Sequence, residues 1–295
     1  MIVSASYRTD IPALYGRWFV GRLAAGGVRV SNPYGGPPTR ISLRPGDVDG
    51  FVFWTRNLEP FADGLAAVEA LALPYMVQFT ATGYPLALER STIAAERAVT
   101  QMRELRTRRG PRALVWRYDP ILFSSLTPPD WHEANFAGLA RALEGACDEV
   151  VVSVARPYRK TARNLDAAAR THGFSWRDPP VEEKRALVAR LADIAGGHGM
   201  ALTLCTQPEL EGIPGTRPAA CVDAGRLSDL AGRPLAARRK GNRPRCACAE
   251  SRDIGAYDSC PQGCAYCYAV SDRAAAQRRL KQHDPEGEFL IAPGE

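Results

Sequence analysis

The sequence lacks the motifs that mark several common enzyme classes. No G-x-G-x-x-G follows its first apolar segment and no G-x-x-x-x-G-K-[ST] occurs, so dinucleotide-binding and P-loop functions have no motif to support them. Only four histidines are present, none in an H-x-x-x-H or H-E-x-x-H pair, and G-x-S-x-G is absent. A histidine metal site and Ser-His-Asp catalysis are therefore disfavoured.

Segments typical of export or membrane insertion are also missing. The N-terminus, MIVSASYRTD, has no basic start followed by an apolar run, and no apolar stretch reaches the length of a membrane span. We therefore expect a soluble, cytoplasmic protein with no membrane partner. The net charge of +6 favours an anionic substrate or nucleic acid only weakly, because arginine is frequent throughout the chain.

Cysteine, in contrast, is plentiful and unevenly placed. Of eight cysteines, Cys147 stands alone and is given no role, while the other seven fall in the last third of the chain. In a reducing compartment, clustered cysteines indicate metal or redox chemistry rather than disulfides.

Short apolar segments alternate with longer amphipathic ones over the first two-thirds of the chain. The expected strands are Ile2–Ser6, Gly50–Thr55, Tyr75–Thr80, Ala113–Tyr118, Glu149–Ala155 and Ala201–Thr206. The expected helices are Ile11–Ala25, Pro60–Leu71, Ile93–Arg109, Asp130–Glu144 and Val181–Ala195. This alternation predicts a parallel sheet covered by helices, either a barrel or an open doubly wound sheet.

Polar residues follow several different strands, which favours the barrel. Barrels of this type build their active sites at the carboxyl ends of many strands, whereas a doubly wound sheet concentrates function at one switch point. We therefore predict a TIM-like, partial βα barrel of six units over residues 1–206. Residues 207–295 are expected to form a cysteine-rich extension over the barrel mouth, and their basic stretch Arg233–Arg245 is expected to be a loop.

The segment CPQGCAYCYA places Cys260, Cys264 and Cys267 in a C-x-x-x-C-x-x-C array, in which Gly263 allows a tight turn. Three thiolates on so short a loop can bind one face of a [4Fe–4S] cluster and leave the fourth iron open for a substrate or cofactor. Structural zinc, with Cys246 or Cys248 as a fourth ligand, is the alternative.

Four further thiols, Cys205, Cys221, Cys246 and Cys248, are the number needed for a second cluster or a zinc site. Cys246 and Cys248 are too closely spaced for a zinc knuckle. The alternative is that Cys205 and Cys221 are buried apolar residues.

The residues expected at the barrel mouth form a polar, cation-rich set that suits a carboxylate, a phosphate or the methionine part of a cofactor. Candidate catalytic residues are Arg8, Asp10, Asn57, Arg117, Asp119 and Lys160, and candidate cofactor-binding residues are Gln78, Thr80, Thr82 and Tyr266. Structural roles are open as well, because Asp10 could cap a helix and Arg117 could pair with Asp119.

The array with Tyr266 before its third cysteine resembles the cluster motif of radical S-adenosylmethionine enzymes. The resemblance implies a [4Fe–4S] cluster whose open iron binds S-adenosylmethionine, a partial barrel of six βα units, and an electron donor such as a ferredoxin or flavodoxin. In that superfamily the motif follows the first strand, whereas here it follows all six, and the loop after the first strand reads SYRTDIP.

The whole chain also resembles a bacterial family catalogued as a domain of unknown function, through SASYRTDIP, FWTRN, WRYDP and a tail of the form CAC-x-x-SRDIGAYDSCPQGCAYCYA. Three functions stay open. The first is a radical S-adenosylmethionine-like enzyme acting on an unknown small-molecule or nucleic-acid substrate. The second is a non-radical [4Fe–4S] enzyme that uses the open iron as a Lewis acid or sulfur-binding site. The third is a nucleic-acid-binding or modifying protein with structural zinc, which uses the basic segment Arg233–Arg245.

Overall fold

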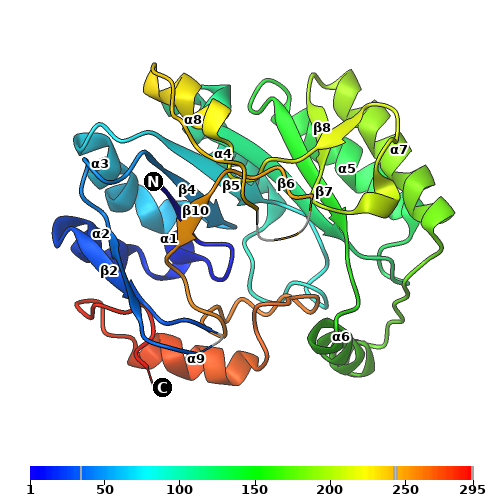
Figure 1. Cartoon of the computed structure of the whole chain (residues 1–295). Coiled ribbons are helices and arrows are strands. Elements are labelled where there is room, and N and C mark those ends of the chain that lie inside the picture. The colour runs from blue at the N-terminus through cyan, green and yellow to red at the C-terminus, as the bar shows by residue number, and fades with distance from the viewer. Residues whose placement is uncertain (34, 242, 244, 294–295) are drawn as a thin grey trace.

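Eight parallel strands form one sheet, and most of them follow one another in chain order (Figure 1). The computed structural model describes residues 1–33, 35–241, 243 and 245–293. From edge to edge, the strands are β10 (Ser251–Asp253), β1 (Ile2–Ala5), β4 (Gly50–Thr55), β5 (Tyr75–Thr80), β6 (Leu114–Ile121), β7 (Glu149–Val154), β8 (Ala201–Leu204) and β9 (Thr216–Pro218).

The prediction of a TIM-like, six-unit barrel is wrong. The sheet is open, with β10 and β9 at its edges, and no pairing joins these two strands within the described residues. In being open and parallel, the sheet is closer to Rossmann-like folds, although its order lacks the reversal that defines a doubly wound sheet. The βα alternation could not separate these architectures, because closure depends on strand tilt and stagger rather than on strand and helix periodicity.

The six predicted strands and the predicted helical segments are present, with ends shifted by a few residues, but Ile11–Ala25 is divided at Tyr15 into two helices and Pro60–Leu71 begins as a 3-10 turn. The helices are α1 (Ile11–Leu14), α2 (Gly16–Ala24), α3 (Ala62–Ala70), α4 (Ala95–Arg109), α5 (Pro129–Leu143), α6 (Arg159–His172), α7 (Val181–Gly197), α8 (Ala224–Ala231) and α9 (Arg273–Gln282). Short 3-10 turns are η1 (Glu59–Phe61), η2 (Pro111–Ala113) and η3 (Pro208–Leu210), and β2 (Gly27–Val30) pairs antiparallel with β3 (Thr39–Ser42). None of the described helices has the length and apolar character needed to cross a membrane.

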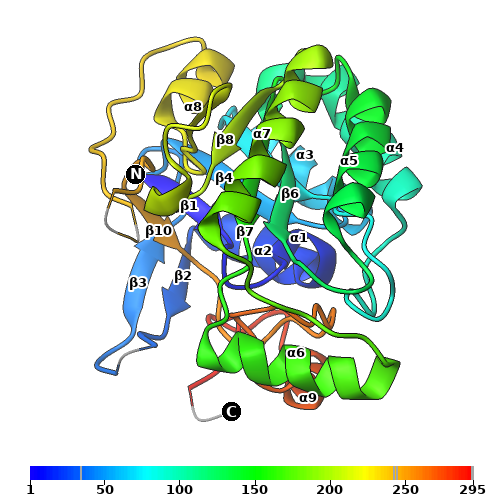
Figure 2. The same cartoon turned by 90° about the vertical axis from the view of Figure 1, so that its right-hand side faces the viewer.

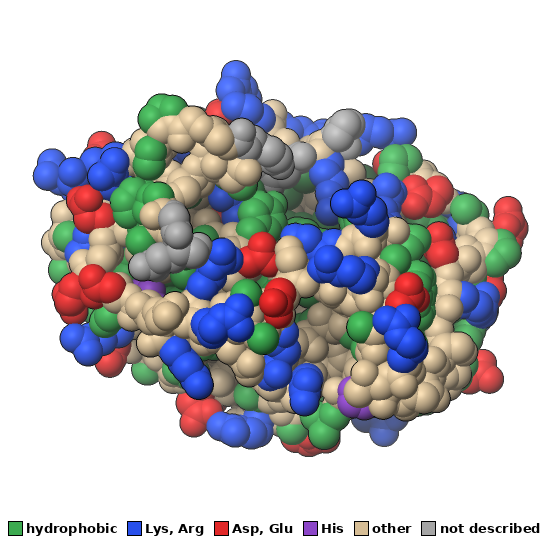
Figure 3. All heavy atoms as spheres, turned by 90° about the horizontal axis from the view of Figure 1, so that it is seen from below, with side chains coloured by type: hydrophobic (Ala, Val, Ile, Leu, Met, Phe, Trp, Pro, Cys, Tyr) green, Lys and Arg blue, Asp and Glu red, His purple; other side chains and the backbone are tan. Residues whose placement is uncertain are grey.

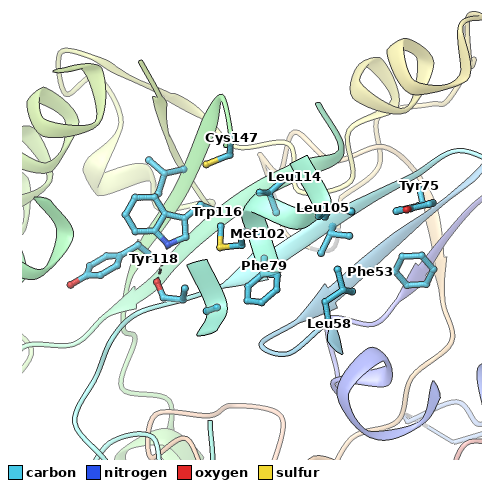
Figure 4. Close-up of a cluster of buried hydrophobic side chains, with 14 of the residues drawn as sticks. Phe53, Leu58, Tyr75, Phe79, Met102, Leu105, Leu114, Trp116, Tyr118 and Cys147 are labelled. Atoms are coloured by element: carbon cyan, nitrogen blue, oxygen red, sulfur yellow. Dashed lines mark hydrogen bonds between the residues drawn. The ribbon is translucent and has the colours of Figure 1, made fainter. Parts of the chain in front are cut away.

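The main core lies between the sheet and the helices α2 to α5 and α7. Alternate strand residues point to this side, and their side chains are fully buried against the helices; Figure 4 shows one part of this core around Phe79, Met102 and Trp116. The Trp116 indole donates to the carbonyl of Ala81 at 2.8 Å, so its polar edge is also satisfied.

The opposite face of the sheet is apolar at its amino-terminal end and polar at its carboxyl end. Val52, Met76 and Val115 pack there against α8 and neighbouring residues of the C-terminal segment. Figure 2 shows α8 beside the strands of the sheet. Further along the same strands, Gln78 and Arg117 take the corresponding positions and are buried as well. Buried polar groups need partners, so this half of the face is where a site is expected.

The C-terminal segment joins the two edges of the sheet. After β9 the chain forms α8, crosses the second face and returns as β10, which pairs with β1 in the register Ser4 to Asp253. Consistent with prediction, Arg233–Arg245 contains no helix or strand in its described residues; residues 242 and 244 lie outside these. From β10 the chain continues to the carboxyl ends of the strands, where it forms the cysteine loop and α9.

Candidate functional site

The loop that carries Cys260, Cys264 and Cys267 is docked on residues 88–91. The amide of Ala265 donates to the carbonyl of Leu88 at 2.8 Å, and the amide of Ser91 donates to the carbonyl of Gln262 at 3.0 Å. Gly263 has φ of +80°, which confirms the predicted need for glycine at this turn. The position of the loop is thus set by backbone pairing with the segment after β5.

The three thiols of this loop lie close enough to interact electrostatically. Burial raises the pKa of each thiol, that of Cys264 to about 12; Cys264 and Cys267 raise the pKa of Cys260 further, and Cys267 raises that of Cys264. The amide of Gln262 is directed at Cys260, and those of Ala269 and Val270 are directed at Cys267. Such N–H donors stabilise the thiolate form, which is the form that binds metal.

A buried polar network lies directly beside Cys264. Arg56 pairs with Glu89 at 2.9 Å and donates to the Tyr266 hydroxyl at 2.6 Å, and Tyr266 in turn donates to Glu89. Thr82 donates to the same carboxylate at 2.6 Å. Within this network the Arg56 guanidinium lowers the pKa of the Cys264 thiol, while the Glu89 carboxylate raises it.

Asp10 connects the first strand to the cysteine loop. Its carboxylate caps α1 at the Ala13 amide (3.0 Å), as predicted, and also accepts from Thr55 (2.7 Å), the Arg56 amide (2.9 Å) and the Gln262 side chain (2.8 Å). Burial raises the pKa of this carboxyl group, and the hydrogen bonds oppose that shift. Asp10 therefore positions the loop.

Asp253 performs a similar task at the other side of β1. Its carboxylate accepts from the hydroxyls of Ser4 (2.8 Å) and Ser6 (2.7 Å) and from the amide of Tyr7 (3.1 Å). Arg8 lies 3.7 Å from the same carboxylate. Arg8, predicted to be catalytic, is thus part of the junction between β1 and β10.

A cavity of about 380 Å³ opens beside the network of Arg56, Glu89 and Tyr266. Two predicted cofactor-binding residues, Thr80 and Thr82, line it together with Arg56 and Glu89. Its polar walls and one guanidinium suit a ligand with an anionic or hydrogen-bonding group.

Gln78, Arg117 and Asp119 form a second group further along the sheet. Arg117 makes a two-pronged ion pair with Asp119 (2.6 and 3.2 Å), as the structural alternative predicted, and donates to Gln78 at 3.1 Å. It also donates to the Cys221 sulfur at 3.2 Å. Gln78 therefore lies with the second set of thiols and not in the cavity of Thr80 and Thr82.

Two predicted catalytic residues lie at the margins. Asn57 accepts from the Gln101 side chain at 2.8 Å and is directed toward α4. Lys160, on α6, lies close enough to Cys267 to lower the pKa of its thiol.

The face of the molecule seen from below the view of Figure 1 carries many Lys and Arg side chains (Figure 3). Helices α6 and α9 lie nearest this face in Figure 1. Their basic residues include Arg159, Lys160, Arg163, Arg273, Arg278 and Lys281.

Glu89 and Gln262 were not identified from the sequence, although they join the cysteine loop to the sheet. Neither belongs to a recognisable motif, and their partners are remote in the chain. A weak signal was available for Gln262, which lies inside the cysteine array itself.

The basic segment Arg233–Arg245 is partly neutralised within the fold. Arg238 and Lys240 both pair with Glu250, at 3.1 and 3.0 Å, and Arg245 pairs with Glu211. These pairs reduce the positive field that a phosphate backbone would meet.

The family model described as a domain of unknown function, DUF1848, matches residues 2–269. The chain belongs to this family. The match runs from β1 to just beyond the cysteine loop and so includes all seven candidate cysteines. Among curated proteins, none matches the chain. Membership in the DUF1848 family confirms the resemblance seen in the sequence, while the likeness to radical S-adenosylmethionine enzymes stays a prediction.

The arrangement of the cysteine thiols can be compared with the ligand geometry that a metal centre requires. In the part of the chain that the structure describes, no three His, Cys, Asp or Glu side chains are grouped so that they could hold a single metal ion. A [4Fe–4S] cluster is larger than one ion, so its ligands stand farther apart. Three half-buried thiols on one loop, with amide donors directed at two of them, have the donor chemistry of such a cluster.

Proposed function

We propose that this protein is an iron–sulfur enzyme in which Cys260, Cys264 and Cys267 hold a [4Fe–4S] cluster. The observation that supports it best is the presence of three thiols on one short loop at the carboxyl ends of the strands, beside Arg56 and Glu89. When bound, such a cluster supplies an iron without a protein ligand, at which a substrate or S-adenosylmethionine can be activated.

The residues around the loop have two tasks in this proposal. Asp10 and the Arg56–Glu89–Tyr266 network keep the loop in place through buried hydrogen bonds, so that the thiols do not move when a ligand enters. Lys160 and Arg56 supply positive charge near the thiols and favour their anionic form.

The cavity lined by Thr80, Thr82 and Arg56 is the proposed binding site for the substrate or cofactor. It shares Arg56 and Glu89 with the network beside Cys264, so a ligand there lies next to the cysteine loop. A carboxylate or phosphate of the ligand would be held by the Thr80 hydroxyl and by the N–H groups of Arg56 that Glu89 and Tyr266 leave free, since the Thr82 hydroxyl already donates to Glu89. S-adenosylmethionine carries such a carboxylate, which makes the radical enzyme the first form of the proposal.

The test is anaerobic purification followed by iron, sulfide and zinc assays and by EPR of the reduced protein with and without S-adenosylmethionine. We expect a reduced [4Fe–4S] signal of which a part changes when S-adenosylmethionine is added, and loss of that responsive part in the C260A/C264A/C267A variant. C147A, at a buried cysteine far from the loop in sequence, is the matched control and should retain the signal.

The other outcomes separate the remaining functions. A cluster signal that does not respond to S-adenosylmethionine would support the non-radical enzyme. Zinc without iron would overturn the proposal.

A further inference from the structure

Four thiols from three separate segments meet on the second face of the sheet. Cys205 follows β8, Cys221 follows β9, and Cys246 and Cys248 belong to the segment before β10. They interact in series: Cys205 with Cys221, Cys221 with Cys248, and Cys248 with Cys246. None of them forms a disulfide.

Polar donors are directed at two of these sulfurs. The buried guanidinium of Arg117 donates to Cys221 at 3.2 Å, and the amide of Val222 donates to Cys248 at 3.4 Å. Asp119 and Gln78 fix Arg117 in this position. N–H donors of this kind surround metal-bound thiolates and balance their charge.

Apolar packing alone does not explain this arrangement. Cysteines often fill cores as small apolar residues, and Cys221 does border the α8 core. A merely apolar thiol, however, gives no reason for a buried guanidinium to face it. Gly241 adds a second observation, since a Cβ there would clash with the Cβ and the sulfur of Cys246; the glycine leaves room for this thiol.

We propose that Cys205, Cys221, Cys246 and Cys248 are the ligands of a second iron–sulfur cluster, separate from the one proposed for the cysteine loop. Four thiolates leave no iron open, so this centre transfers electrons and does not bind substrate. The thiols stand in series rather than around one point, so loading draws the segment with Cys246 and Cys248 toward Cys205 and Cys221. The inference uses residues distinct from the cysteine loop and does not rest on the proposed function.

The experiment uses the full chain with the first site removed. The C260A/C264A/C267A variant is purified anaerobically and assayed for iron, sulfide and zinc. We expect about four iron and four sulfide per chain in this variant, and near-zero values once C221S and C248S are added. Adding C147S instead, at a buried cysteine that interacts with none of the four, should leave the iron unchanged.

A second measurement guards against variants that fail to fold. In the otherwise unchanged chain, C246S/C248S should lower iron from about eight to about four per chain, with the circular dichroism spectrum retained. Three outcomes would overturn the second cluster. The first is a triple variant that is folded but contains no iron, the second is zinc in place of iron, and the third is a disulfide among the four cysteines found by mass spectrometry. Because the two sites are removed separately, failure of one proposal is distinguishable from failure of the other.

Discussion

Arg56 and Glu89 form an ion pair directly beside Cys264, with 2.9 Å between Nη1 and Oε2 and side chains only 12% and 3% exposed. Removing one member leaves the other charge buried without compensation. We expect R56A to lower the free energy of unfolding by roughly 3–5 kcal/mol, measured by urea denaturation.

The double variant R56M/E89Q provides the control for this pair. Because the double variant removes both charges, its decrease in the free energy of unfolding should be smaller than the sum of the decreases in R56M and E89Q. Additive losses would show that the two side chains act independently and would contradict the ion pair.

Asp253 is predicted to hold β10 beside β1. D253A removes the acceptor for the hydroxyls of Ser4 and Ser6 and for the Tyr7 amide, so we expect a loss of about 1–3 kcal/mol and faster amide hydrogen exchange over residues 251–267. D47A is the matched control, because exposed Asp47 accepts from the Ser42 hydroxyl at 2.5 Å. Its effect should stay within about 0.5 kcal/mol. Unchanged exchange in D253A would contradict the proposed role.

From the burial of His132 we predict a specific dependence of the free energy of unfolding on pH. It is buried and neutral: its Nε2 donates to the carbonyl of Leu122 at 3.0 Å, and its Nδ1 accepts from Tyr118 at 2.9 Å. Burial lowers its pKa to about 4, so the unfolded chain binds a proton first as pH falls. The stabilisation is complete above about pH 6.5 and declines by roughly 3 kcal/mol down to about pH 4.

Unfolding by urea at several pH values tests this dependence. H132Q should show a smaller loss between pH 6.5 and 4 than the unchanged protein, and H172Q, at an exposed position on α6, should show the full loss. Equal slopes for H132Q and the unchanged protein would exclude His132 as the cause.

Gly263 tests the turn in the cysteine loop. A Cβ at this position would lie 2.6 Å from Arg273 Nε, which donates to the carbonyl of Pro261 at 2.8 Å. G263A therefore loses this bond in addition to about 1–2 kcal/mol for the positive φ. G173A has a left-handed backbone, with φ of +68° and ψ of +39°, and nothing within 4 Å, so it measures the backbone cost alone. Thermal unfolding should show a larger loss in G263A, and equal losses would contradict the clash.

The regular elements of the first two-thirds could be predicted because each has a clear apolar period. The exceptions show the limit of that signal. Helix α6 is amphipathic, but its sequence is mostly polar and it buries only Thr161 and Leu165, so it was not recognised as part of the fold. β9 and β10 have three residues each, and the position of β10 depends on Asp253 meeting serines on the first strand.

The site was predictable in its composition and less so in its arrangement. The cysteine array and polar strand ends gave Cys264, Asp10 and Arg117, because residue type and position after a strand carry that information. The partners of Arg56 could not be predicted from the sequence, because Glu89 lies in a loop that carries no recognisable motif. Sheet closure was predicted wrongly for a related reason, as stagger between strands leaves no local mark.

The insertion of β10 beside β1 has a consequence for the order of events during synthesis. Residues 6–250 separate β1 from β10, so one edge of β1 stays unpaired until residues 251–253 have been made. The cysteine loop is made after β10. The nascent chain therefore carries an open strand edge while the other strands of the sheet are synthesised, and any metal centre on the loop is assembled only after residues 260–267 have left the ribosome.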